Sequence, residues 1–125
     1  MKIYLDSAQT GSWKLPAGCP SVQGVTTNPS LVHQAGLPVN LPSYLDLLRA
    51  AADHGFAELM LQLPDKDLAL AATWLEALRA LSQRLSVQLT VKLPCAPEWE
   101  ACIRWIQGQG QPVLLTGLSN PVQLL

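Results

Sequence analysis

Stretches with a strand pattern alternate with stretches that have a helix pattern along the whole of this 125-residue chain. The strand patterns lie near residues 2–8, 24–28, 57–63, 87–93 and 112–116. Alternating strands and helices predict a parallel sheet, because parallel strands need crossover connections, and these are right-handed. The predicted fold class is therefore α/β, with a parallel (β/α) barrel of TIM type as the architecture.

The chain is too short to close such a barrel. A closed barrel has eight strands and takes about 200 residues or more. We therefore expect a single partial domain over residues 1–125 that holds about the first five β/α units, an incomplete barrel. Its open sheet edges are an aggregation hazard, so we expect either a homo-oligomer or completion by a missing C-terminal half.

Cap residues and apolar stripes predict the helices. Asn28 before Pro29 predicts a short helix, and Asn120 before Pro121 repeats that opening. Asp65 is the expected N-cap of a long helix that ends near Gln83. Two further helices are expected over residues 42–54 and from 97 to about 107, whereas residues 9–23 predict a turn or two of helix at most.

Composition and charge exclude several classes of protein. A net charge of −1 and a pI near 6.0, without any basic run, argue against nucleic-acid binding. No apolar run approaches the roughly 18 residues of a membrane span. Cys19, Cys95 and Cys102 are an odd number without metal-ligand spacing, which argues against zinc and a disulfide framework. We therefore expect a cytoplasmic protein that uses no metal and contacts neither nucleic acid nor membrane.

Polar side chains are expected to converge where the strands end. With two-residue periodicity, the inward residues near the strand ends are all polar, whereas their outward neighbours are apolar. Because the carboxyl ends of barrel strands carry catalytic residues, these side chains predict one site. The predicted members are Asp6, Thr26, Asn28, Gln62, Lys92 and Thr116.

Lys92 suggests the chemistry of this site. It is a lone cation near the end of a buried strand, and burial of an ammonium is costly unless the group is paired or neutralised. A lysine in a concave site suggests covalent catalysis through a Schiff base, for which the amine must be neutral. At a pKa near 10.4, only about one amine in 2500 is neutral at pH 7. Asp6 then fits proton transfer at a substrate hydroxyl, since its charge would favour the ammonium.

Simpler interpretations of each residue remain open at this point. Asn28 could serve only as a helix cap, Thr26 and Thr116 are ordinary strand residues, and Gln62 could satisfy a neighbour's hydrogen bonds. Asp6 and Lys92 could form a structural ion pair. Cys95 could approach the same site, although a small buried thiol is the simpler interpretation.

Three motifs resemble the transaldolase family, in its branch of small transaldolases and fructose-6-phosphate aldolases. They are Ile3-Tyr4-Leu5-Asp6-Ser7-Ala8, Gly24-Val25-Thr26-Thr27-Asn28-Pro29-Ser30-Leu31 and Val91-Lys92-Leu93-Pro94. The resemblance implies a (β/α)₈ barrel without a cofactor that cleaves or transfers a dihydroxyacetone unit on sugar phosphates, in carbohydrate metabolism. It also implies Lys92 as the imine-forming residue, Asp6 as acid/base, Asn28 as a ligand of donor hydroxyls, and Gln62 with Thr116 as holders of the catalytic water.

Besides another kind of lysine-dependent aldolase, against which the motif from Gly24 to Leu31 argues, two functions remain open. The first is a transaldolase-like Schiff-base aldolase, weak or inactive as this chain alone, because an unfinished barrel leaves Lys92 near water with a high pKa. The second is a non-catalytic half-barrel scaffold, or pseudoenzyme, that assembles through its open sheet edges.

Overall fold

The computed structural model describes residues 3–13 and 22–117, which form an α/β fold around one open, all-parallel sheet. Its five strands lie side by side in chain order. They are β1 (Tyr4–Asp6), β2 (Gly24–Thr26), β3 (Glu58–Gln62), β4 (Gln88–Pro94) and β5 (Val113–Thr116). All five strand stretches are therefore present, although β1 is shorter than the pattern of residues 2–8 predicted.

Helices form the crossovers between these strands. Two helices follow β2, one follows β3, and a short 3-10 turn with one helix follows β4. A 3-10 turn, η1 (Thr10–Ser12), also follows β1. The connecting elements are α1 (Pro29–Gln34), α2 (Leu41–Asp53), α3 (Leu68–Leu85), η2 (Pro97–Trp99) and α4 (Glu100–Gly108). No helix of the described residues is long and apolar enough to cross a membrane.

The helix starts follow local hydrogen bonding. Asn28 and Asn40 each cap a helix by accepting from the backbone N–H three residues on, at 2.9 Å. The prediction that Asp65 caps the long helix is wrong, because Asp67 accepts from Ala69 N and Leu70 N instead. The Asp65 carboxylate accepts from Asp67 N at 3.1 Å, so it shapes the turn before the helix. The predicted opening at Asn120 lies outside the described residues.

The long helix also ends later than predicted. α3 continues to Leu85, two residues past Gln83, and its C-cap Ser86 has a left-handed backbone with φ 57°. His54 is the C-cap of α2, and His33 lies in the last turn of α1, which Ala35 caps.

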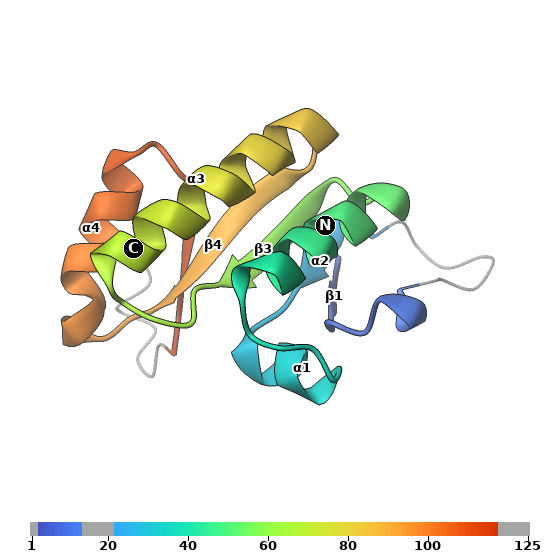
Figure 1. The fold of residues 1–125 in the computed structure, drawn as a ribbon, viewed down its shortest axis with the longest axis horizontal. Helices are drawn as coiled ribbons and strands as arrows, with labels where there is room; N and C mark the ends of the chain where they lie inside the picture. The colour runs from blue at the N-terminus through green and yellow to red at the C-terminus, as the bar shows by residue number, and fades with distance from the viewer. Residues whose placement is uncertain (1–2, 14–21, 118–125) are drawn as a thin grey trace.

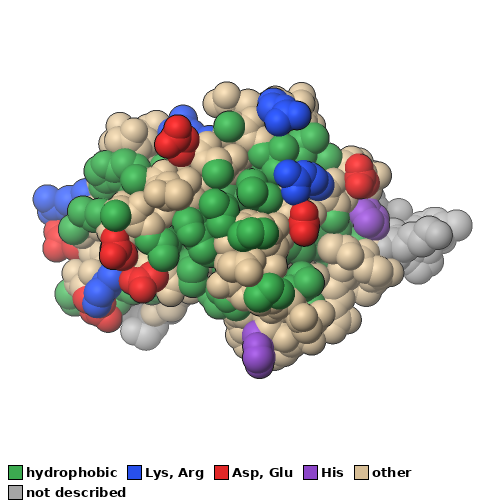
Figure 2. All heavy atoms as spheres, in the orientation of Figure 1, with side chains coloured by type: hydrophobic (Ala, Val, Ile, Leu, Met, Phe, Trp, Pro, Cys, Tyr) green, Lys and Arg blue, Asp and Glu red, His purple; other side chains and the backbone are tan. Residues whose placement is uncertain are grey.

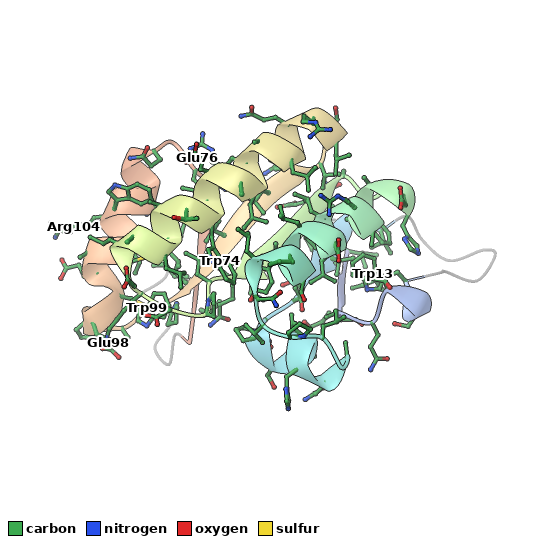
Figure 3. The ribbon with its side chains drawn as sticks, in the orientation of Figure 1. Trp13, Trp74, Glu76, Glu98, Trp99 and Arg104 are labelled. Carbon is green, nitrogen blue, oxygen red and sulfur yellow. The ribbon has the colours of Figure 1, made fainter. Side chains whose placement is uncertain are left out.

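The main core lies between the sheet and the helices on one of its faces. α2, α3 and α4 lie on the near side of the sheet in Figure 1, and α2 and α3 run side by side. The outward residues of the middle strands are almost fully buried beneath them: Val25, Leu59, Leu61, Leu89, Val91 and Leu93. Trp74 of α3, which Figure 3 labels, packs edge to face against Tyr44 of α2, with ring centroids 4.9 Å apart.

The two sides of the sheet differ in their polarity. Acidic and basic side chains are scattered over the helical side rather than gathered in one patch (Figure 2). The opposite side, here called the inner face, carries the residues that alternate with the buried leucines and valines. In the described part of the chain no helix covers the inner face, and most of its residues are polar.

Candidate active site

The strand register places most of the predicted site residues on the inner face. Parallel pairing sets Asp6 beside Thr26 and Gln62 beside Lys92, and paired residues point to the same side of a sheet. Thr116 pairs with Pro94, one inward position beyond Lys92. Asn28 lies just past the end of β2, at the start of α1. Strand geometry thus gathers these residues at the carboxyl edge.

The Lys92 side chain reaches from β4 across the sheet to Thr26 on β2. Its Nζ donates a hydrogen bond to Thr26 Oγ1 at 2.8 Å, although β3 lies between their two strands. Thr26 is the last residue of β2 and pairs with Met60, one inward position before Gln62, so the lysine side chain reaches across β3 to the end of β2. A long flexible side chain can span this distance, and the hydrogen bond fixes its end.

Burial affects the pKa of Lys92. Only 7% of the residue is exposed, and this desolvation lowers the pKa of its ammonium, while the Asp6 carboxylate opposes the change. The expectation of a lysine near water with a high pKa is therefore wrong.

The Asp6 carboxylate affects the Lys92 ammonium electrostatically, without an ion pair between them. The ion pairs among the described residues join Arg49 to Asp46 and Arg104 to Glu100, both on helix surfaces. Asp6 is itself exposed at the end of β1. The interpretation of Asp6 and Lys92 as a structural ion pair is thus wrong, and the Asp6 carboxylate is open to a ligand.

The remaining predicted residues have structural contacts of their own. Asn28 Oδ1 accepts from Leu31 N, which confirms the capping role and leaves its NH₂ group to reach a ligand. Thr116 Oγ1 donates to Leu93 O at 3.4 Å, a long bond to the neighbouring strand. Gln62 is fixed through its backbone, since its carbonyl accepts from the Tyr44 hydroxyl at 2.7 Å.

The buried carboxylate on the inner face was not predicted from the sequence. Glu58 is 4% exposed and accepts from two hydroxyls, Tyr4 at 2.7 Å and Thr90 at 2.6 Å. The bond to this carboxylate is the main cause that raises the pKa of the Tyr4 phenol. The two-residue period of a strand could have identified this group. Glu58 points to the same face as Met60 and Gln62, and Tyr4 points to the same face as Asp6.

Two surface hollows lie away from Lys92. One of about 460 Å³ lies between α3 and α4 and includes Trp105. Another of about 710 Å³ runs along α4 and includes Cys95 and Leu115. Lys92 lines neither of them, and no group of three metal-ligating side chains occurs within residues 3–13 and 22–117. The candidate site is therefore an open polar face centred on Lys92.

Together, the fold and this face define a parallel α/β protein whose polar residues surround one buried lysine. Comparison with known proteins connects the chain to probable transaldolases, in agreement with the resemblance of its motifs. Probable transaldolases from Desulfatibacillum aliphaticivorans and Aquifex aeolicus (strain VF5) are 26% and 25% identical to it, over 128 and 130 residues. Both matches take in 100% of this chain and 54% of the relative, so the chain spans about half the length of the curated relatives it matches. No family model matches the chain.

Proposed function

We propose that this chain carries a transaldolase-like site for Schiff-base aldol chemistry, with Lys92 as the imine-forming residue. The observation that supports this most is the position of Lys92, buried among polar side chains and held at 2.8 Å from Thr26. Burial favours the neutral amine, which is the form that attacks a carbonyl. The distant similarity to probable transaldolases points to the same chemistry.

The proposed reaction begins with attack by the neutral amine on a ketone carbon. A C–N bond forms and one proton passes from the nitrogen to the carbonyl oxygen. A second proton, taken from the solvent, lets that oxygen leave as water, and the nitrogen keeps one proton in the imine. The protonated imine then accepts the electron pair of the C–C bond that breaks, which is why the reaction needs no cofactor. Asp6 takes the proton of the substrate hydroxyl as the aldehyde leaves, and returns a proton when a new aldehyde adds.

The other site residues follow from the same proposal. Asn28 binds the hydroxyls of the donor through its NH₂ group, and Thr26 borders the same donor subsite. Gln62 and Thr116 hold the water that later hydrolyses the imine. The substrate class is a dihydroxyacetone-type ketone or a sugar phosphate that contains this unit.

We also propose that the open sheet is the first part of a (β/α) barrel of TIM type. The relatives are about twice as long as this chain, and an open parallel sheet with helices on one face has the layering of a barrel wall. A second copy of the chain or a C-terminal half would then cover the inner face. On its own, the chain should turn over slowly.

Trapping of the imine tests the function directly. The protein is incubated with dihydroxyacetone or fructose 6-phosphate, reduced with borohydride and digested for mass spectrometry. We expect a reduced adduct on Lys92 that disappears in Lys92→Arg. Lys66→Arg is the matched control, since Lys66 is exposed in the loop after β3, and it should leave the adduct unchanged. A folded protein that gives no adduct on Lys92 with either compound would overturn the proposal.

A scaffold without catalysis is the second candidate, and the sheet edges favour it. Among the described residues no strand pairs with the outer edge of β1 or of β5, and Leu114 on β5 is 45% exposed. Exposed apolar strand edges promote association. Sedimentation of the purified chain separates the two candidates when combined with trapping, because a scaffold forms a defined oligomer but gives no adduct.

A further inference from the structure

We infer that Thr26 is the positioning residue of Lys92: its hydroxyl holds the lysine nitrogen in its buried position on the inner face. This inference deepens the function proposed above and rests on it for its chemical consequence. The hydrogen bond of 2.8 Å between Nζ and Oγ1 is the observation that carries it. A threonine that fixes the lysine has a different role from one that only borders the donor.

The geometry gives this single contact its importance. Lys92 starts from β4 beside Gln62, yet its nitrogen ends at Thr26 on β2, beyond the intervening strand. Within the described residues this is the one hydrogen bond that the Nζ atom makes. A lysine side chain otherwise extends its ammonium into water. The Thr26 hydroxyl therefore determines whether the Nζ atom of Lys92 is buried or hydrated.

Few charged groups compete for this nitrogen. The titratable side chains that share the inner face are Asp6 on β1 and Glu58 on β3, and Tyr4 is bonded to Glu58. β2 and β5 present only uncharged residues there, namely Gly24, Thr26, Leu114 and Thr116. Asp6 is exposed and beyond direct contact, and Glu58 already accepts two hydroxyls. The position of the lysine nitrogen thus depends on a neutral acceptor.

The chemical consequence has a definite sign. Removal of the acceptor leaves a buried ammonium without a partner, and rotation of the side chain into water relieves this cost. The hydrated ammonium then regains a high pKa, and the neutral amine becomes scarcer. If Thr26 merely solvated an ammonium that stayed in place, its loss would instead lower the lysine pKa.

The test is a titration of Lys92 by NMR in protein labelled with ¹³C at the lysine Cε, for which Lys92→Arg assigns the signal. Thr26→Val keeps the side-chain volume and removes the acceptor, whereas Thr26→Ser keeps an acceptor. In Thr26→Val we expect the midpoint to rise by about one pH unit, which lowers the neutral fraction at pH 7 about tenfold. Thr26→Ser should retain the wild-type midpoint. If the valine variant does not fold, Thr26→Ala replaces it.

Thr90→Val is the matched control. Thr90 lies on the same face, one inward position before Lys92, but its hydroxyl donates to Glu58 and not to the lysine. This variant should leave the Lys92 midpoint unchanged. An unchanged or lowered midpoint in Thr26→Val, or equal shifts in Thr26→Val and Thr90→Val, would contradict the inference.

Borohydride trapping in the same variants keeps the two proposals apart. A raised midpoint in Thr26→Val with no adduct even in the wild type would leave the positioning role standing and remove the aldolase function. Trapping at the wild-type rate at pH 7 in Thr26→Val would leave the function standing and remove the positioning role. The combination expected is a raised midpoint with trapping about tenfold slower at that pH.

Discussion

Tyr4 and Glu58 are joined by a hydrogen bond of 2.7 Å that crosses a whole strand of the sheet. The residue between them is Gly24, which pairs with Tyr4 on one side and with Glu58 on the other. Because glycine has no side chain, the phenol of Tyr4 can lie across β2 and reach the carboxylate. This contact ties three strands together below the Lys92 site.

Gly24→Ala should therefore destabilise the fold. A Cβ at this position would lie 2.0 Å from the backbone oxygen of Glu58, and a backbone atom cannot move away cheaply. We expect a loss of about 2 kcal/mol or more in the free energy of unfolding, measured by urea denaturation. Gly108→Ala is the control, since nothing lies within 4 Å of a Cβ there. Equal stability of the two variants would contradict the close approach of β2 and β3.

Tyr44 makes the fold sensitive to high pH. Its ring is fully buried, and burial raises the pKa of its hydroxyl well above the usual value of 10.0. The folded protein then holds the proton after the unfolded chain has lost it, so this contribution to stability is complete below pH 10 and falls as pH rises further. Tyr44→Phe should lose about 1 kcal/mol at pH 7 and show a flatter decline above pH 10. If the stability of Tyr44→Phe and of the wild type fell equally above pH 10, Tyr44 would not be the cause of the decline.

Lys92 should have the opposite pH dependence. Burial lowers its pKa below 10.5, so at neutral pH the folded state binds the lysine proton less tightly than the unfolded chain does. This contribution to stability is complete above pH 10.5 and is lost as pH falls through the folded pKa. Lys92→Met should thus gain most over the wild type at neutral pH, and the gain should shrink toward high pH. Urea denaturation at several pH values measures this, and a gain that grows with pH would contradict it.

Asn28 and Asn40 form a matched pair that separates capping from ligand binding. Both have extended backbones at helix starts, with φ −147° and −148°, and both accept at 2.9 Å. Alanine at either position should cost about 1 kcal/mol of stability. Only Asn28→Ala should also weaken trapping of dihydroxyacetone, because Asn28 lies at the site and Asn40 does not. Equal trapping of dihydroxyacetone in the two variants would show that Asn28 only caps its helix.

Local sequence rules predicted the elements of this fold well. Alternating residues gave the strands and their faces, so the buried row that includes Leu59 and Leu61 and the polar row that includes Gln62 and Lys92 were both predictable. The start of α1 was predictable for the same reason, because Asn28 and Pro29 act within a few residues. The start of α3 was not, since Asp65 and Asp67 are both able to cap and the turn geometry chose between them.

The sequence by itself thus determined the order of strands and helices, the inward direction of the polar side chains and the presence of a lysine among them. Only the tertiary structure decided which partner that lysine has. Charge favoured Asp6, but Lys92 donates to Thr26 across β3. The tertiary structure likewise placed the Glu58 carboxylate between the hydroxyls of Tyr4 and Thr90. The physical reason is that such bonds depend on strand register and sheet curvature, which arise from contacts between residues far apart in the chain.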